Sequence, residues 1–347
     1  MDLDGKTILI TGCAGFIGSN VAKRLLGDVN DIKLIGIDNM NDYYDTSLKE
    51  TRIEELKEHP SFIFLKGNIA DRDLINTVFQ KYTPQIVVNL AAQAGVRYSI
   101  ANPDAYIESN LIGFYNILEA CRHSGDKGKG VEHLVYASSS SVYGNNKKVP
   151  YSTEDRTDVP VSLYAATKKS NELMAYSYSG LYKIPATGLR FFTVYGPAGR
   201  PDMAYFDFTN KLCKGEKIRI FNYGNCKRDF TYIDDIVAGV VSVMRKAPVA
   251  DENGVRHKVY NIGNNRPESL LDFVDILQQE LIHAGVLDSE YDFESHKELV
   301  PMQPGDVEAT WADIDELVKD FGFRPHTDLR DGLRQFAEWY KKFYKKA

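Results

Sequence analysis

The stretch Thr7-Ile8-Leu9-Ile10-Thr11-Gly12-Cys13-Ala14-Gly15-Phe16-Ile17-Gly18 decides the fold of this chain of 347 residues. A short apolar run typical of a buried strand ends in a loop with the spacing G-x-x-G-x-x-G, and residues 17–26 follow with a helical pattern. The glycines allow a tight turn, and backbone N–H groups can then approach a pyrophosphate at the positive end of the helix. The loop alone is weak evidence, because a strand-to-helix turn that binds nothing can have the same spacing.

Strand-like and helix-like segments alternate through the first half of the chain. Apolar runs at residues 34–37, 62–65, 86–90 and 134–137 are separated by helical segments. This alternation predicts crossover connections and therefore an α/β fold, a Rossmann-type doubly wound parallel sheet with helices on both faces.

The second half of the chain is less regular. Beyond residues 195–197, strand segments such as 218–221 are interleaved with helices, and the tail from residue 329 has apolar residues at helical spacing. We therefore predict a Rossmann domain over residues 1–190, with return segments near 230–265. Residues 191–347 are expected to form mainly a smaller C-terminal α/β domain that binds the substrate.

Composition excludes several classes of protein. A formal net charge of -6 argues against a nucleic-acid partner. The seven histidines form no H-x-H or H-E-x-x-H motif, so no metal is expected. We find no signal segment and no apolar run of membrane-spanning length. The cysteines contain no C-x-x-C pair and indicate reduced thiols in a cytoplasmic protein: Cys13, Cys121, Cys213 and Cys226.

Residues after the later strands extend the candidate dinucleotide site. Asp38, followed by Asn39, ends the second strand about 20 residues after Gly18, where a carboxylate can accept both ribose hydroxyls. A carboxylate there also repels a 2′-phosphate, so NAD is favoured over NADP. Asn68 and Ile69 follow the third strand, where an adenine edge would lie, although a polar turn is nearly as good an explanation. Small residues after the fourth strand either let a cofactor pass close to the backbone or only pack tightly: Leu90, Ala91 and Ala92.

The motif Tyr-x-x-x-Lys occurs three times, beginning at Tyr143, Tyr164 and Tyr223. The first and third matches contain Gly-Asn, which breaks a helix and turns the two side chains apart. Only between Tyr164 and Lys168 are all the residues compatible with a helix, so that both side chains share one face.

This pair suggests chemistry at an alcohol carbon, because the preceding strand ends in the hydroxyl groups of Ser138 to Ser141. The Lys168 ammonium is expected to stabilise the Tyr164 phenolate. A tyrosine tuned in this way can take a proton from a hydroxyl while hydride leaves the carbon, and a neighbouring serine can share that proton.

Together these residues resemble the extended short-chain dehydrogenase/reductase family, in its nucleotide-sugar branch of epimerases and dehydratases. Three longer strings are more specific and closely resemble UDP-glucuronate 4-epimerases: LAAQAGVRYS at 90–99, RFFTVYGPAGRPDMA at 190–204 and QPGDV at 303–307.

The resemblance implies roles for individual residues. Ser139 resembles the catalytic hydroxyl, Tyr164 the base, Lys168 its partner and Asn110 an asparagine on the cofactor side. Asn68 departs from the aspartate common in relatives, although an amide can still pair with adenine. Ser140 and Ser141 stand where dehydratases and decarboxylases carry an acid. The residues expected to bind the UDP-sugar, with hydroxyls of the serines and Thr193 on a uronate carboxylate, are Gly95, Arg97, Ser139, Ser140, Ser141, Tyr164, Thr193, Arg200, Arg228 and Asp306.

The reaction implied is interconversion of UDP-glucuronate and UDP-galacturonate, with NAD as cofactor. Oxidation at C4 gives a 4-keto sugar, which rotates and is reduced on its other face without loss of C6. The resemblance also implies a homodimer formed through helices around residues 102–120 and 164–182. The alternatives are a 4,6-dehydratase or UDP-xylose-forming decarboxylase, an epimerase of neutral UDP-sugars, and a cofactor-bound regulator that has lost catalysis.

Overall fold

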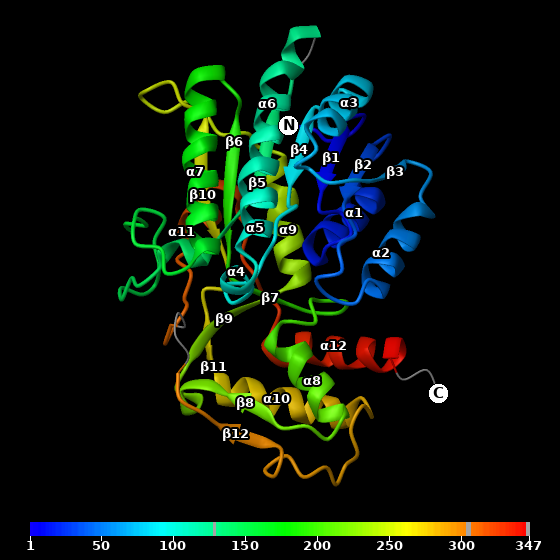
Figure 1. Ribbon diagram of the computed structural model, residues 1–347, viewed down its shortest axis with the longest axis vertical. Coiled ribbons are helices and arrows are strands. Elements are labelled where there is room, and N and C mark those ends of the chain that lie inside the picture. The colour runs from blue at the N-terminus through cyan, green and yellow to red at the C-terminus, as the bar shows by residue number, and fades with distance from the viewer. Residues whose placement is uncertain (128–129, 303–306, 345–347) are drawn as a thin grey trace.

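The predicted apolar runs form the centre of a parallel sheet in the computed structural model, which describes residues 1–127, 130–302 and 307–344. Seven strands lie in the order β10-β6-β5-β4-β1-β2-β3, and every neighbouring pair is parallel (Figure 1). The predicted fold class is confirmed. The strands are β1 (Thr7–Thr11), β2 (Lys33–Asp38), β3 (Phe62–Lys66), β4 (Ile86–Asn89), β5 (His133–Ser139), β6 (Ala186–Phe191) and β10 (His257–Ile262).

Helices cover both faces of this sheet because successive strand side chains point to opposite sides. Leu9 of β1 lies in an apolar cluster with residues of α3, α6 and α7, whereas Ile8 and Ile10 pack with residues of α1, α2 and α9. One layer contains α3 (Arg72–Tyr82), α6 (Gly113–His123) and α7 (Leu163–Tyr182); the other contains α1 (Phe16–Asp28), α2 (Ser47–Lys57) and α9 (Ile233–Met244).

Short helical segments connect β4 to α6. They are α4 (Tyr98–Ala101), α5 (Pro103–Tyr106) and a π-helical turn, η1 (Ile107–Ile112). Three single 3₁₀ turns complete the short helices: η2 (Ser124–Lys127), η3 (Ser140–Tyr143) and η4 (Phe221–Gly224).

A second group of elements lies below the large sheet in Figure 1. A three-stranded sheet has the order β11-β9-β7, and β12 pairs with β8. The elements are β7 (Thr193–Tyr195), α8 (Ala204–Cys213), β8 (Ile218–Ile220), β9 (Lys227–Tyr232), β11 (Pro267–Ser269), α10 (Leu270–His283), β12 (Lys297–Leu299) and α12 (Leu329–Tyr344). The helix α11 (Asp315–Phe321) contacts β10 of the large sheet instead.

After β9, the chain returns to the large sheet through α9 and β10. β10 pairs with β6, and α9 packs on the same face as α1. The core on that face continues into α8, α10 and α12, so the two groups of elements share one apolar cluster. The division of the chain at residue 190 into two domains stays a prediction.

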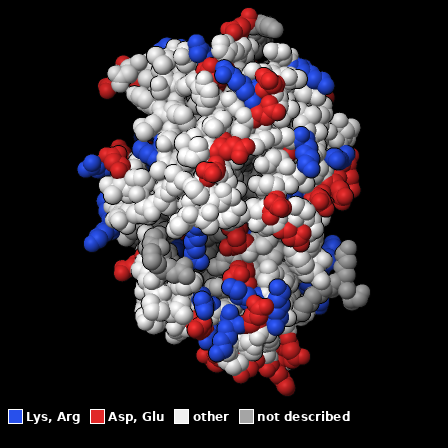
Figure 2. All heavy atoms as spheres, viewed as in Figure 1, with Lys and Arg blue, Asp and Glu red and all other residues white. Residues whose placement is uncertain are grey.

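Acidic and basic side chains are interspersed on the face seen in Figure 2. Basic groups gather over its lower part, among acidic ones. Ion pairs in the second group of elements include Arg219 with Glu298 and Lys297 with Glu294. Within the described ranges, no helix combines the length and the apolar character needed to cross a membrane.

Candidate active site

A cavity of about 260 Å³ opens at the carboxyl ends of the central strands. β1 and β4 are neighbours in the sheet although β2 and β3 lie between them in sequence, and ligands of open α/β sheets bind at such a switch point. Many of the predicted site residues line this one cavity: Gly12, Gly15, Phe16, Ile17, Gly18, Asp38, Asn39, Asn68, Ile69, Leu90, Ala91, Ala92, Ser139, Tyr164, Lys168 and Arg200.

Two glycines of the loop, Gly12 and Gly18, lie too close to neighbouring backbone atoms to carry a side chain. Gly12 has φ +72°, and a Cβ there would lie 2.7 Å from the backbone nitrogen of Ala91. A Cβ on Gly18 would collide with the carbonyl oxygen of Gly12. Gly15 caps α1 without a side chain, so the first N–H groups of that helix face the cavity side of the loop and suit an anionic group.

Asp38 is held in a fixed orientation at the end of β2. Its Oδ2 accepts a hydrogen bond from Ala14 N at 3.1 Å, and its Oδ1 accepts one from Met40 N at 2.9 Å. Lys49, which also lines the cavity, donates to the carbonyl oxygen of Asn41 at 2.8 Å. Burial lowers the pKa of Lys49, while the negative charge of Asp38 acts in the opposite direction.

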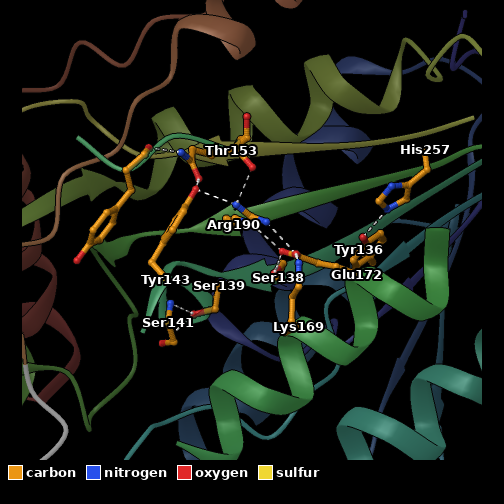
Figure 3. Close-up of polar contacts among 12 residues, drawn as sticks. Tyr136, Ser138, Ser139, Ser141, Tyr143, Thr153, Lys169, Glu172, Arg190 and His257 are labelled. Atoms are coloured by element: carbon orange, nitrogen blue, oxygen red, sulfur yellow. Dashed lines mark hydrogen bonds and ion pairs between the residues drawn. The ribbon is translucent and has the colours of Figure 1, made fainter. Parts of the chain in front are cut away.

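Ser139, Tyr164 and Lys168 come together from two elements. Ser139 ends β5, and the other two lie on the first turns of α7, whose N-cap Ser162 accepts from Ala165 N at 3.1 Å. The Ser139 hydroxyl donates to Ser141 Oγ at 3.1 Å and accepts from Ser141 N at 3.2 Å (Figure 3). Lys168 Nζ donates to the carbonyl oxygen of Ala137 at 2.9 Å and lies 6.0 Å from the centre of the Tyr164 ring.

The expected lowering of the Tyr164 pKa by Lys168 is wrong in its net direction. Burial raises the pKa of Tyr164, and the hydrogen bond with Ser139 and the positive charge of Arg200 only partly offset this. Burial also lowers the pKa of Lys168 to about 8. Desolvation, which disfavours the charged form of both groups, is therefore the largest influence on the pKa of each.

The other two Tyr-x-x-x-Lys matches are not helical pairs, as predicted. Tyr143 ends the turn η3, is buried, and donates from its hydroxyl to Asn261 Oδ1 at 2.6 Å. Tyr223 has φ +52° and is 53% exposed. Neither lines the cavity among the described residues.

Asn110 lies behind the cavity rather than on its wall. Its side chain accepts from Gln93 N at 2.8 Å and donates to the carbonyl oxygen of Gln93 at 3.0 Å and to Thr167 Oγ1 at 3.1 Å. It therefore links the loop after β4 to α7 from within the π-helical turn. These contacts fit an asparagine that helps to hold the cofactor side of the site, and direct contact with the cofactor stays a prediction.

Several predicted substrate residues are also absent from the described cavity wall. Arg97 lies over the ring of Phe221 at 5.0 Å from its centre. Arg228 donates to the carbonyl oxygens of Lys227 and Glu308 at 3.0 and 3.2 Å. Asp306 lies outside the described residues. The remaining members of this group are Gly95, Ser140, Ser141 and Thr193.

Arg200 lines the cavity but is already paired. Its Nε donates to Asp202 Oδ1 at 3.0 Å, and Tyr43 OH donates to Asp202 Oδ2 at 3.1 Å. The negative charge of Asp202 is therefore balanced beside Tyr164, and the pKa of Asp202 is lowered by Arg200 although burial raises it.

Sequence reasoning missed Arg52, the buried link between the glycine loop and the turn before Arg200. Its Nη1 donates to the carbonyl oxygen of Ala14 at 2.7 Å and to Tyr44 OH at 3.0 Å, and its Nη2 donates to the carbonyl oxygen of Gly199 at 3.1 Å. No local motif marks an arginine on α2 for this role. Other cavity residues that were missed lie on loops, on α2 or in η1, without a marked spacing: Tyr43, Tyr44, Lys49, Gln93 and Ser109.

Comparison with known proteins decides the family. The model of the GDP-mannose 4,6 dehydratase family matches residues 9–336. The chain belongs to the GDP-mannose 4,6 dehydratase family. This membership agrees with the resemblance to extended short-chain dehydrogenases/reductases and leaves the reaction open, since dehydratases and epimerases share the fold.

Relatives of this family member are similar over their whole length or most of it. Protein CapI of Staphylococcus aureus is 48% identical, with 98% of this chain and 99% of CapI covered. UDP-glucuronate 4-epimerase 2 of Arabidopsis thaliana is 43% identical over 99% of this chain and 78% of its own. The crystal structure of UDP-glucuronic acid 4-epimerase from Bacillus cereus, in complex with UDP-glucuronic acid and NAD, has a TM-score of 0.84 and 32% identity, with 97% of this chain and 100% of that chain covered.

Proposed function

We propose that this protein interconverts UDP-glucuronate and UDP-galacturonate by epimerisation at C4, with NAD as its cofactor. The observation that carries the proposal is the near full-length similarity to UDP-glucuronate 4-epimerases, in sequence and in structure. It is supported by the convergence of Ser139, Tyr164 and Lys168 on one cavity. The protein is accordingly an isomerase.

The residues of the cavity fit NAD. The glycine loop and the first turn of α1 would hold the pyrophosphate, since residues 16–18 of that helix line the cavity and no Cβ fits at Gly12 or Gly18. Asp38 would accept hydrogen bonds from the adenosine ribose, and its carboxylate would oppose a 2′-phosphate. When bound, NAD accepts hydride from C4 of the sugar and returns it.

Tyr164 is proposed as the base for the C4 hydroxyl proton. Its pKa is raised by burial, so the phenol holds a proton tightly, and the hydroxyl of Ser139 and the charge of Arg200 favour its release. Lys168 adds positive charge on the same helix. The same phenol then returns the proton to O4 after the keto sugar has turned over.

Retention of C6 is supported by the scarcity of acidic side chains on the described cavity wall. Of the described residues that line it, Asp38 alone carries a carboxylate, and Asp38 is placed at the end of β2 on the glycine-loop side. Ser140 and Ser141 offer hydroxyls, which cannot act as a general base at C5. We propose that these serines, Thr193 and Arg200 hold the uronate carboxylate; direct roles of Gly95, Arg97, Arg228 and Asp306 remain predictions.

A comparison of substrates tests this proposal. UDP-glucuronate should be converted to UDP-galacturonate, and UDP-glucose should react poorly, because donors that pair with a carboxylate stay unpaired against a neutral CH₂OH. Thr193→Ala should raise the KM for UDP-glucuronate. Equal kcat/KM for the two sugars would favour the neutral-sugar epimerase instead.

A homodimer is proposed through the helices that include residues 102–120 and 164–182. Large apolar side chains are exposed there, including Ile112 at 46%, Leu173 at 60% and Leu181 at 68%. Leu173→Glu with Leu181→Glu should give a monomer in sedimentation, whereas Val249→Glu, at a site that is 83% exposed, should leave the dimer intact. A wild-type monomer would contradict this proposal.

A cytoplasmic location is also proposed. None of the four cysteines, all of which lie in the described residues, forms a disulfide bond, as is usual in a reducing compartment.

A further inference from the structure

A buried ion pair lies directly behind the proposed catalytic residues. Glu172 of α7 and Arg190 of β6 each have side chains that are 4% exposed. Arg190 Nε donates to Glu172 Oε1 at 2.8 Å and Nη2 donates to Oε2 at 2.9 Å, so the contact is bidentate (Figure 3). Glu172 is one helical turn beyond Lys168, and the pair therefore joins the catalytic helix to the sheet.

The same carboxylate holds the strand from which Ser139 projects. Ser138 Oγ donates to Glu172 Oε1 at 2.7 Å, and both side chains are buried. Successive strand side chains point to opposite sides, so Ser138 can face Glu172 while Ser139 keeps its own contacts. The hydrogen bond from Lys168 Nζ to Ala137 O is a second tie between the same two elements. Two adjacent positions of β5 are thus fixed to α7 immediately before Ser139.

Arg190 also holds the segment that follows the serines. Its Nη1 donates to Tyr143 OH at 3.0 Å, and Tyr143 in turn donates to Asn261 of β10. Figure 3 shows Ser139 and Ser141 between the two anchored residues, Ser138 and Tyr143. The serine run is therefore fastened at both ends to one ion pair.

We propose that Ser138, Glu172 and Arg190 are positioning residues that hold the Ser139 hydroxyl against Tyr164. The proposal rests on the proposed function, since it assumes that Ser139 and Tyr164 act on the sugar. Ser138 is thereby separated from the other three serines: its hydroxyl serves the protein framework, not the substrate.

Displacement of Ser139 should be visible in the titration of Tyr164. Hydrogen bonding to Ser139 lowers the pKa of Tyr164, as does Arg200, whereas burial and Asp202 raise it. Lys168 and the edge of the Tyr106 ring also face this phenol. If Ser139 moves away while these other groups stay, the pKa of Tyr164 rises. A change that affected only the stability of the fold would leave that pKa where it is.

The test is Ser138→Ala in the NAD-loaded enzyme, with Ser179→Ala as its matched control. Ser179 is a buried serine of α7, the helix that carries Glu172, and its hydroxyl has no hydrogen-bond partner in the described part of the chain. Ser138→Ala should lower kcat on the order of ten-fold with little change in KM, since it removes a charge-assisted hydrogen bond that orients a reacting group. It should also move the acidic limb of the kcat profile to higher pH. Ser138→Thr, which keeps the hydroxyl, should restore both values.

The proposal is overturned if Ser138→Ala and Ser179→Ala have the same kcat and the same pH profile. It is also overturned if Ser138→Ala loses activity only in proportion to a lowered Tm, with the acidic limb unmoved. A direct absorbance titration of Tyr164, with Tyr164→Phe as the blank, gives a readout besides turnover. Failure of the proposed function is distinguishable, because the wild-type protein would then not convert UDP-glucuronate to UDP-galacturonate, whatever the effect of Ser138→Ala on the pKa of Tyr164.

Discussion

The guanidinium of Arg52 donates a hydrogen bond to the carbonyl oxygen of Ala14 at 2.7 Å. Ala14 belongs to the glycine loop, and the same guanidinium reaches the carbonyl oxygen of Gly199, next to Arg200. Among the described residues Arg52 forms no ion pair with a carboxylate, although its side chain is 2% exposed. One buried cation therefore sets the spacing between the proposed cofactor loop and the turn that carries Arg200.

Arg52→Met should weaken NAD binding and lower stability together, because the carbonyl groups of Ala14 and Gly199 lose their donor. Each buried group left unpaired costs about 1–3 kcal/mol. Urea unfolding and fluorescence titration with NAD measure the two effects. Arg24→Met, at an exposed arginine of α1 paired with Asp28, should change stability by less than about 1 kcal/mol. An Arg52→Met protein with wild-type affinity for NAD would disprove the link.

Asp38→Ala should weaken NAD binding and narrow the preference for NAD over NADP. Lys49 also lines the cavity, and the charge of Asp38 affects its pKa. Without the Asp38 carboxylate, the Lys49 ammonium can attract a 2′-phosphate. Isothermal titration with both dinucleotides gives the ratio. The double change Asp38→Ala with Lys49→Met should lose the gain for NADP. If the wild-type protein binds NADP as tightly as NAD, the assignment of Asp38 is wrong.

Tyr164→Phe should abolish turnover while UDP-sugar binding persists, since the ring remains and only the proton acceptor is lost. Loss of a general base costs on the order of a hundred- to ten-thousand-fold in kcat. Tyr223→Phe is the matched control, at the exposed tyrosine of the third motif match. A comparable loss in both variants, measured by initial rates, would contradict the choice of Tyr164. Tyr143→Phe is not a suitable control, because the buried hydroxyl of Tyr143 accepts a hydrogen bond from Arg190.

Lys168→Met should be more stable than the wild type near pH 7 and inactive. Burial lowers the pKa of Lys168 to about 8 from 10.5. The unfolded chain therefore binds more protons than the native protein between pH 8 and 10.5. Wild-type stability should gain on the variant through that window, whereas below it the buried ammonium costs about 3 kcal/mol at most. The lost hydrogen bond to Ala137 reduces the advantage of the variant.

Urea unfolding of both proteins at pH 7 and pH 10 measures the difference. If Lys168→Met is less stable than the wild type at pH 7, or if the difference in stability does not change with pH, burial does not destabilise the charged form of Lys168.

The sequence predicted the large sheet well because its strands are buried on both faces and appear as unbroken apolar runs. Residues 34–37 and 86–90 are examples, and they became β2 and β4. The cofactor side of the site followed from this, since Gly12, Asp38 and Ala91 come directly after strand ends that meet at one edge. The structure also confirms that, of the three Tyr-x-x-x-Lys matches, only Tyr164 and Lys168 share one helix, because Gly-Asn breaks a helix locally.

Features that depend on distant parts of the chain were not predictable in this way. Asn110 was expected on the cofactor side of the site, but the sequence does not show that its side chain bonds to Gln93 and Thr167. The partners of Arg52 and Glu172 lie on other elements, and no spacing in the sequence reveals them. The net direction of the Tyr164 pKa shift was not predicted. The sequence shows that the charge of Lys168 is near Tyr164 on one helix, but it does not show that other elements bury the phenol.

The most direct test of the central claim is NMR of the reaction with UDP-glucuronate labelled with ¹³C throughout its sugar. Purified protein with NAD should convert the glucuronate signals to those of galacturonate, with inversion at C4 and the carboxylate carbon C6 still in the sugar. Release of the C6 carbon as labelled carbon dioxide, in proportion to the substrate consumed, would show a decarboxylase and contradict the account.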